Sequence, residues 1–147
     1  MRILAVDPGE KRIGIALSDP TGTIATPLAI LKHKSRQIDV KTIIQLTKEN
    51  NAQKILIGQA LNDDGSPTAQ SKRAEHLAGM IEDSTNVPVI LWDESGSTQA
   101  VRSAQIAMGV PRQKRRRPID DLAAAYILQT YLDYHSRVVE DDLNEDQ

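Results

Sequence analysis

Residues 3–18 read ILAVDPGEKRIGIALS, and this stretch decides the fold expected for the chain. The apolar run Ile3–Val6 is typical of a buried strand, and Pro8 and Gly9 after it favour a turn. Positions 13, 15 and 17 then carry Ile, Ile and Leu with small residues between them, which predicts a second strand. The two strands follow one another closely, and Asp7 is expected where the first of them ends.

Apolar periodicity predicts strands and helices along the rest of the chain. Further strands are expected at Ala25–Leu31, Lys54–Gly58 and Val87–Trp92. Helices are expected at Ser35–Glu49, Pro67–Asp83, Thr98–Met108 and Ile119–Tyr134. A meander of three strands followed by strand–helix alternation predicts an α/β fold, with a mixed five-stranded sheet flanked by helices.

Composition limits the class of protein. A chain of 147 residues is long enough for one domain with a hydrophobic core, and the absence of Phe means that this core must be aliphatic. The absence of Cys excludes disulfides, thiolate metal sites and cysteine nucleophiles. There is no signal-peptide pattern and no apolar run of about 20 residues that could span a bilayer, so a cytoplasmic protein is expected.

Charge is segregated along the chain. The net charge is −2, yet residues 140–147 hold five acidic and no basic residues, so the remainder carries 18 basic against 15 acidic residues. We expect one domain at residues 1–136 and an acidic, disordered tail at residues 137–147. In contrast to this acidic tail, the segment Arg112–Arg117 is basic, since five of its six residues are Arg or Lys. The prolines on both sides favour a loop.

Three carboxylates are candidate metal ligands. Asp7 ends the first strand, Glu94 follows the strand Val87–Trp92, and Asp120 opens the last helix. Each has an ordinary explanation alone, such as a turn or a helix start. Together they could hold a hard divalent cation, Mg²⁺ or Mn²⁺, because such ions prefer oxygen ligands.

Periodicity orients these acids relative to their neighbours. Strand alternation should turn Asp93 and Glu94 to opposite sides. The inner face of the last helix is expected to hold Ile119, Leu122, Ala123, Tyr126, Ile127 and Tyr131. Helical phase then places Asp120 at the edge of that face, near Asp7, and turns Asp121 away.

Basic residues beside these acids suit a phosphate backbone. Lys11 and Arg12 follow the first strand, although ordinary hairpin charge explains them equally well. The basic loop leads directly into Asp120, and its cations are Arg112, Lys114, Arg115, Arg116 and Arg117. Carboxylates beside such a loop point to hydrolysis of phosphodiester bonds, and the chain shows no Ser–His or Cys–His pair in a context that suits covalent catalysis.

Four motifs carry a resemblance to a known family. They are LAVDPGEKRIGIALSD, ILIGQALNDDGS, VILWDESGST and IDDLAAAYILQTYL. In this order and spacing the chain resembles the YqgF/RuvX-type family, the pre-16S rRNA nucleases also described as Holliday junction resolvase-like proteins, over Met1–Tyr134. The resemblance implies an RNase H-like fold and places the family's motif acids on Asp7, Glu94 and Asp120. The chain departs from the family at Ala60, where Pro is usual, and at Ser95, where Arg is usual.

Three functions remain open at this point. The first is a metal-dependent nuclease acting on structured RNA, in 5′-end processing of precursor 16S rRNA, with the ribosomal precursor particle as a partner. The second is a Holliday junction resolvase-like DNA endonuclease, since the same acids would serve either polymer. The third is a non-catalytic nucleic-acid-binding or ATP-binding protein of the same fold. The 2′-hydroxyl contacts that separate RNA from DNA leave no signature in the sequence, and the oligomeric state is equally open.

Overall fold

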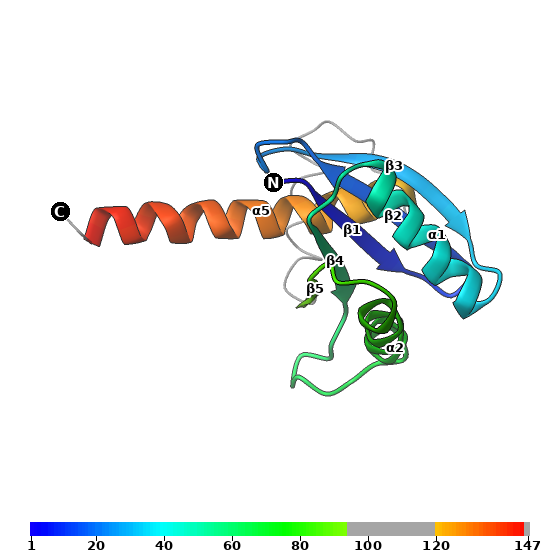
Figure 1. Cartoon of the computed structure of the whole chain (residues 1–147). Helices are drawn as coiled ribbons and strands as arrows, with labels where there is room; N and C mark the ends of the chain where they lie inside the picture. The colour runs from blue at the N-terminus through cyan, green and yellow to red at the C-terminus, as the bar shows by residue number, and fades with distance from the viewer. Residues whose placement is uncertain (94–119, 146–147) are drawn as a thin grey trace, which may run out of the picture.

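A computed structural model describes the backbone of residues 1–93 and 120–145, and the side chains of residues 1–93 and 122–136. Its strands form one five-stranded sheet in the order β3-β2-β1-β4-β5 (Figure 1). The strands are β1 (Ile3–Pro8), β2 (Arg12–Ser18), β3 (Ala25–Lys32), β4 (Lys54–Gln59) and β5 (Val89–Asp93). The helices are α1 (Arg36–Glu49), α2 (Ala69–Ser84) and α5 (Asp120–Glu145). The mixed five-stranded sheet predicted from the sequence is confirmed.

The sheet combines an antiparallel and a parallel half. β1 pairs with β2, and β2 with β3, in antiparallel fashion, whereas β1–β4 and β4–β5 are parallel pairs. Parallel strands have their carboxyl ends at one edge, which is where ligands bind in open α/β sheets. The ends of β1, β4 and β5 therefore share the edge to which Asp7 belongs.

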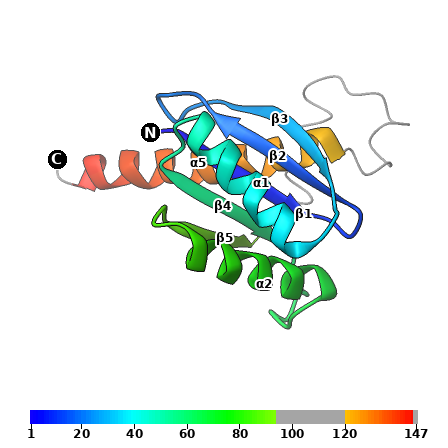
Figure 2. The same cartoon turned by 45° about the vertical axis from the view of Figure 1, so that its right-hand side comes forward.

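Helices cover both faces of the sheet (Figure 2). On one face Leu4 and Val6 of β1 pack in a cluster with buried residues of α1 and α2. On the other face Ile3 and Ala5 pack in a second cluster with α5. This division follows from the two-residue alternation of a strand. Buried Tyr126 and Tyr131 are the aromatic members of a core that is otherwise aliphatic among the described residues, as the absence of Phe predicts.

The first two helices begin where their capping residues predict. Ser35 caps α1 and its hydroxyl accepts a hydrogen bond from the Ile38 amide. Thr68 caps α2, where its side chain and that of Ser71 form a reciprocal capping box. The apolar periodicity that predicted a helix at Pro67–Asp83 corresponds to the buried face of α2, whose apolar residues are Ala74, Leu77, Ala78 and Ile81. The predicted helix at Thr98–Met108 lies outside the described residues.

Helix α5 differs from expectation in length, and its buried face agrees with the prediction at Tyr126, Ile127 and Tyr131 but not throughout. It continues to Glu145, past the predicted end at Tyr134, so most of the segment expected to be disordered has a helical backbone. Residues 135–145 contain no Gly or Pro to stop a helix, which accounts for the continuation. Its most deeply buried residues are Ala124 and Leu128, which the sequence analysis left out, while Leu122 and Ala123 are only half-buried. Within the described residues, no helix has the length and apolar character that crossing a membrane requires.

Candidate metal centre and nucleic-acid interface

Asp7 faces the layer that contains α5. Ile3 and Ala5, four and two residues before it, pack in the α5 cluster, and alternation along β1 carries Asp7 to that same face. The carboxyl group is half-buried, one residue before the end of the strand. β1 thus presents a carboxylate at the carboxyl edge of the sheet, on the side where α5 begins.

Glycines flank Asp7 on both neighbouring strands. Gly14 of β2 is its partner in the antiparallel ladder. On β4, Ile57 pairs with Val6, and the next residue along each strand is Gly58 and Asp7. Gly58 belongs to the same face as Leu56, which packs in the α5 cluster. Glycine has no side chain, so at these two positions neither β2 nor β4 places a side chain beside the Asp7 carboxylate.

The start of α5 belongs to the same layer. Asp120 is the first residue of this helix, four residues before Ala124, which is only 1% exposed in the cluster against the sheet. Residues four apart share a helical face. The prediction that helical phase turns Asp121 away stays a prediction, because the side chain of Asp121 lies outside the described ones.

The other predicted ligands lie outside the described side chains. Glu94 follows the last described residue of β5, and the side chains of Asp120 and Asp121 are not described. In the portion whose side chains are described, no three His, Asp or Glu residues gather as a metal site. Asp7 is the one predicted ligand whose side chain can be placed.

The alternation of strand β5 supports the prediction that Asp93 points to the opposite side from the residues next to it. Trp92 packs against the α5 cluster, and its indole N–H donates to the Thr130 hydroxyl at 3.3 Å. Val89 packs in the cluster on the α1 and α2 face. Asp93 lies four residues after Val89 on the same strand. Strand alternation therefore places both on the α1 and α2 side of the sheet, opposite to Trp92.

The β1–β2 hairpin requires glycine at its first turn position. The Gly9 amide donates to the Arg12 carbonyl at 2.9 Å, and a Cβ atom built on Gly9 would lie 2.4 Å from that same oxygen. This tight turn presents the exposed side chains of Lys11 and Arg12, the two hairpin cations selected from the sequence. They stand at the carboxyl end of β1, close to the strand position of Asp7.

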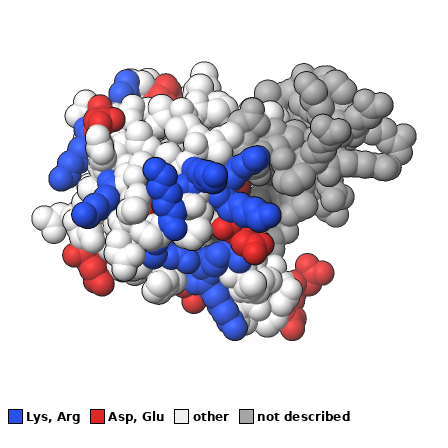
Figure 3. All heavy atoms as spheres, turned by 90° about the vertical axis from the view of Figure 1, so that its right-hand side faces the viewer, with Lys and Arg blue, Asp and Glu red and all other residues white. Residues whose placement is uncertain are grey.

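More basic residues gather at this end of the molecule than the sequence analysis selected (Figure 3). Lys32 is the ladder partner of Arg12, and the His33 amide donates to the Lys11 carbonyl. The gathering comes from three separate segments: the hairpin, the end of β3 with the start of α1, and the start of α2. Its additional members are Lys32, Lys34, Arg36, Lys72 and Arg73.

Sequence reasoning missed this surface because nothing in local spacing relates the three segments. Lys72 and Arg73 read as solvated residues at the start of a helix. The fold brings these residues to this end, because the side-chain amide of Gln70 donates to the Gly58 carbonyl and accepts from the Ala60 amide, which holds the start of α2 against the end of β4. The predicted basic loop Arg112–Arg117 lies outside the described residues.

Comparison with known families gives a match over most of the chain. Residues 1–134 match the family described as RuvX, Holliday junction resolvase. The chain belongs to the RuvX family. This membership confirms the recognition made from the four motifs, and with it the class of enzyme, a nuclease.

Relatives of similar length support the RuvX assignment. A protein of Syntrophus aciditrophicus named "Putative pre-16S rRNA nuclease" is 42% identical over 133 residues, which are 90% of this chain and 89% of that protein. A protein of the same name from Clostridium kluyveri is 36% identical over 137 residues, 93% of this chain and 100% of its own length.

Solved structures confirm the fold. The RuvC protein of T. thermophilus, in complex with a Holliday junction substrate, has a TM-score of 0.66 at 14% identity, over 93% of this chain and 96% of that one. The fowlpox virus Holliday junction resolvase has a TM-score of 0.53 at 18% identity, over 91% of this chain and 99% of that one. At such identities the similarity concerns the fold alone, which is the RNase H-like fold predicted from the motifs.

Proposed function

We propose that this RuvX-family protein is a divalent-metal-dependent nuclease whose metal ligands are Asp7, Glu94 and Asp120. The observation that carries the proposal is the placement of Asp7. Its half-buried carboxyl group stands at the carboxyl edge of the sheet, between two glycines, on the face where α5 begins. A carboxylate at this edge of the sheet is a suitable ligand for Mg²⁺ or Mn²⁺, which prefer oxygen ligands.

The other two ligands are proposed from periodicity. Trp92 belongs to the α5 face, and one further step of strand alternation would assign position 94 to that face as well. Asp120 opens α5 four residues before Ala124, which packs on the sheet. The three acids therefore come from β1, from the residue after β5 and from the start of α5, all expected on one side of the sheet.

When bound, a divalent ion would activate a water molecule and stabilise the leaving oxygen of a phosphodiester. The chain's own contribution is to hold the ion and to orient the substrate. Lys11 and Arg12 stand at the end of β1, and Arg112, Lys114, Arg115, Arg116 and Arg117 precede Asp120 in the sequence. Contacts from such residues to phosphates position a strand without reading its sequence.

The substrate we propose is precursor 16S rRNA, cleaved during 5′-end processing in the cytoplasm and presented by the ribosomal precursor particle. The names of the two relatives that cover most of the chain support this choice. The description of the RuvX family favours a second candidate, a branched DNA junction. Neither candidate changes the roles proposed for the three acids.

The test is cleavage of matched substrates in Mn²⁺. A structured RNA carrying the 5′ region of precursor 16S rRNA, the DNA of the same sequence and a four-way DNA junction would be incubated with the wild type and with Asp7→Asn. We expect cleavage of the RNA by the wild type and no cleavage by Asp7→Asn, although the variant still shows cooperative unfolding without metal. Asp133→Asn is the matched control, because Asp133 is exposed on α5 and bonds only Gln129 among the described residues.

Each other outcome has a definite meaning. Preferential cleavage of the four-way junction would show that the substrate is branched DNA. Full activity of Asp7→Asn would remove Asp7 from the metal site. No cleavage of any substrate, together with no effect of Mn²⁺ on melting, would replace the nuclease by the non-catalytic nucleic-acid-binding or ATP-binding protein of the same fold.

A further inference from the structure

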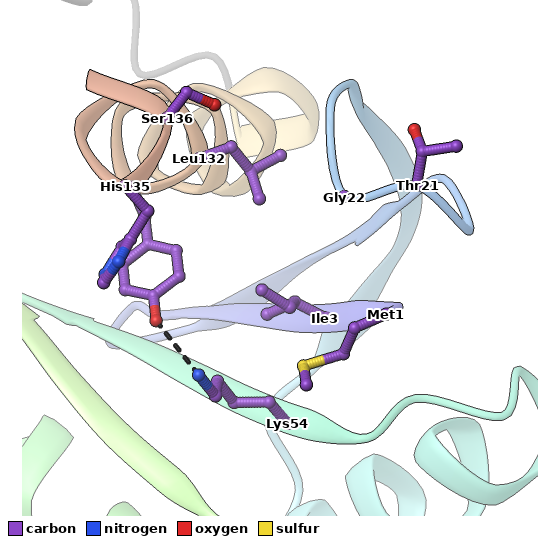
Figure 4. A pocket seen from close by; sticks show the side chains of 9 residues that line it. Met1, Ile3, Thr21, Gly22, Lys54, Leu132, His135 and Ser136 are labelled. Carbon is purple, nitrogen blue, oxygen red and sulfur yellow. Dashed lines mark hydrogen bonds between the residues drawn. The ribbon is translucent and has the colours of Figure 1, made fainter. Parts of the chain in front are cut away.

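A pocket of about 470 Å³ lies between α5 and the beginning of β1, away from the candidate metal centre (Figure 4). Ile3 and Leu132 form part of its apolar lining, and Lys54, Tyr131 and His135 form a polar side. Ile3 precedes Asp7 by four residues along β1, about 13 Å at the rise of a strand. The pocket is thus a separate site at the opposite edge of the sheet.

Lys54 gives this pocket an uncompensated positive charge. Its ammonium group donates to the Tyr131 hydroxyl at 3.3 Å and lies 5.8 Å from the centre of the Tyr131 ring. Among the residues described, these are its contacts, and no carboxylate stands within ion-pair distance of it. None of the residues that line the pocket is acidic.

The carboxylate of Asp19, in the turn beside the pocket, is committed elsewhere. It accepts hydrogen bonds from the amides of Thr23 and Ile24 and from the hydroxyl of Thr21, a residue that lines the pocket. The Asp19 carboxylate therefore stabilises its own turn and does not neutralise the charge of Lys54. A partly buried cation without a charged partner is costly, and a bound anion would offset that cost.

The polar groups around Lys54 suit the oxygens of a phosphate. Tyr131 accepts the hydrogen bond from Lys54, so its own hydroxyl proton remains available to donate. The His135 ring lies 4.3 Å from that of Tyr131, and Figure 4 shows the His135 side chain on the same side of the pocket as the Lys54 ammonium. Lysine is a common partner of phosphate, and the apolar lining suits an attached organic group.

We propose that this pocket binds the phosphate group of a nucleotide. The phosphate would contact Lys54 and Tyr131, and the rest of the nucleotide would lie on the apolar surface formed by Ile3 and Leu132. The nucleotide is either a free mononucleotide or the phosphorylated end of a nucleic-acid strand, since both present the same chemistry. The proposal does not depend on the nuclease function.

The experiment is an NMR titration of the full chain in EDTA, which removes metal ions from the proposed metal centre. The ligands are AMP, adenosine, inorganic phosphate and a short RNA with a 5′ phosphate, and the signals followed are the ring protons of Tyr131 and His135. We expect AMP or the 5′-phosphorylated RNA to shift these signals at submillimolar to millimolar concentration, and adenosine to leave them in place. A stronger response to AMP identifies a free mononucleotide as the ligand, and a stronger response to the RNA identifies a strand end.

Two variants and a control make the test specific. Lys54→Gln should weaken binding by about tenfold or more, and Tyr131→Phe, which keeps the ring but removes the hydroxyl, should weaken it by several-fold. Lys48→Gln is the control, because Lys48 is an exposed lysine of α1, the helix on the other face of the sheet.

The proposal is overturned if adenosine binds as well as AMP, if no phosphate ligand shifts the ring protons at millimolar concentration, or if the Lys54 and Lys48 variants bind alike. Should Lys54→Gln fail to fold, Tyr131→Phe still decides, and unchanged affinity in that variant would equally reject the site. Cleavage by the wild type in Mn²⁺ has no part in these readouts.

Discussion

Asp7 of β1 stands directly opposite Gly14 of β2 in the antiparallel ladder, so no side chain adjoins its carboxylate on that strand. An ion or a phosphate group bound to Asp7 would need this side of the carboxylate to be clear of side chains. Gly14→Ala would place a methyl group beside Asp7, on the face that α5 covers. We expect cleavage to fall by roughly 10- to 100-fold, because small displacements of reacting groups are expensive.

The measurement for Gly14→Ala is the cleavage rate at saturating Mn²⁺, with melting followed in parallel. Ala29→Gly in β3 serves as a comparison, since Ala29 pairs with Ile15 and belongs to the α1 and α2 face. A Gly14→Ala protein that folds and cleaves at the wild-type rate would show that the space beside Asp7 is not used.

Metal binding should stabilise the folded protein. Carboxylates that share a site repel one another without a cation, so Mg²⁺ or Mn²⁺ should raise the melting temperature by linkage. At ten times its dissociation constant a metal ion contributes about 1.4 kcal/mol, roughly 4 °C for a domain near this size. Asp7→Asn should lose most of this response, whereas Asp133→Asn should keep it. Equal responses of the two variants to Mn²⁺ in thermal melting would exclude Asp7 as a ligand.

The basic loop should contribute to binding more than to the chemical step. Replacing Arg115, Arg116 and Arg117 with Ala should weaken binding similarly for substrates of different sequence. The log–log salt dependence of binding should flatten by roughly 0.7 for each phosphate of a single strand that the variant no longer neutralises. Cleavage at saturating substrate should survive better, because the proposed metal ligands remain.

The control for the loop is Lys41→Ala with Lys48→Ala, which removes two exposed cations of α1. Affinity would be measured by fluorescence anisotropy over a range of salt concentrations with a catalytically inactive Asp7→Asn background. If the salt slope does not change in the triple variant, the loop does not contact the phosphates of the substrate and is only a charged surface.

Asp19 should make stability depend on pH in the acid range. The amide of Ile24, the hydroxyl of Thr21 and the amide of Thr23 donate to this carboxylate and hold its pKa well below the usual range. Because the folded pKa is depressed, the stabilisation is fully present above the unfolded pKa and is lost as pH falls. Asp19→Asn should therefore be less stable than the wild type at neutral pH, and the difference should shrink below about pH 5.

Urea unfolding of the two proteins between neutral pH and pH 3 measures this effect. Asp63→Asn, at an exposed acid of the loop between β4 and α2, is a suitable reference because it leaves the Asp19 turn intact. A stability difference between wild type and Asp19→Asn that stays constant over this range would contradict the assigned hydrogen bonds.

The sequence alone determined the elements whose signals are local. The strands in residues 3–18 and the helices expected at Ser35–Glu49 and Pro67–Asp83 each depend on neighbours within a few residues, and each is confirmed within one or two residues. The four motifs also identified the family and the fold. Asp7, at the end of a buried strand, could be selected as a ligand for the same reason, although its role remains a proposal.

Only the tertiary structure decided which alanines of α5 are buried. Three consecutive alanines, Ala123, Ala124 and Ala125, give a weak periodic signal, because small apolar residues fit both an interface and a solvated face. The contact with the sheet buries Ala124 and Leu128 most deeply, beside the predicted Tyr126, Ile127 and Tyr131.

Long-range juxtapositions were equally decided by the fold. Lys54 and Tyr131 are 77 residues apart, and no local pattern relates them, yet the packing of α5 beside β4 brings the ammonium to the hydroxyl. In the same way the start of α2, which carries Lys72, lies at the same edge of the sheet as the hairpin because β4 runs parallel to β1. Local periodicity determines which side of a helix or strand is apolar. Which helices and strands pack together depends on burying all the apolar faces at once, and this packing brings the residues of each site together.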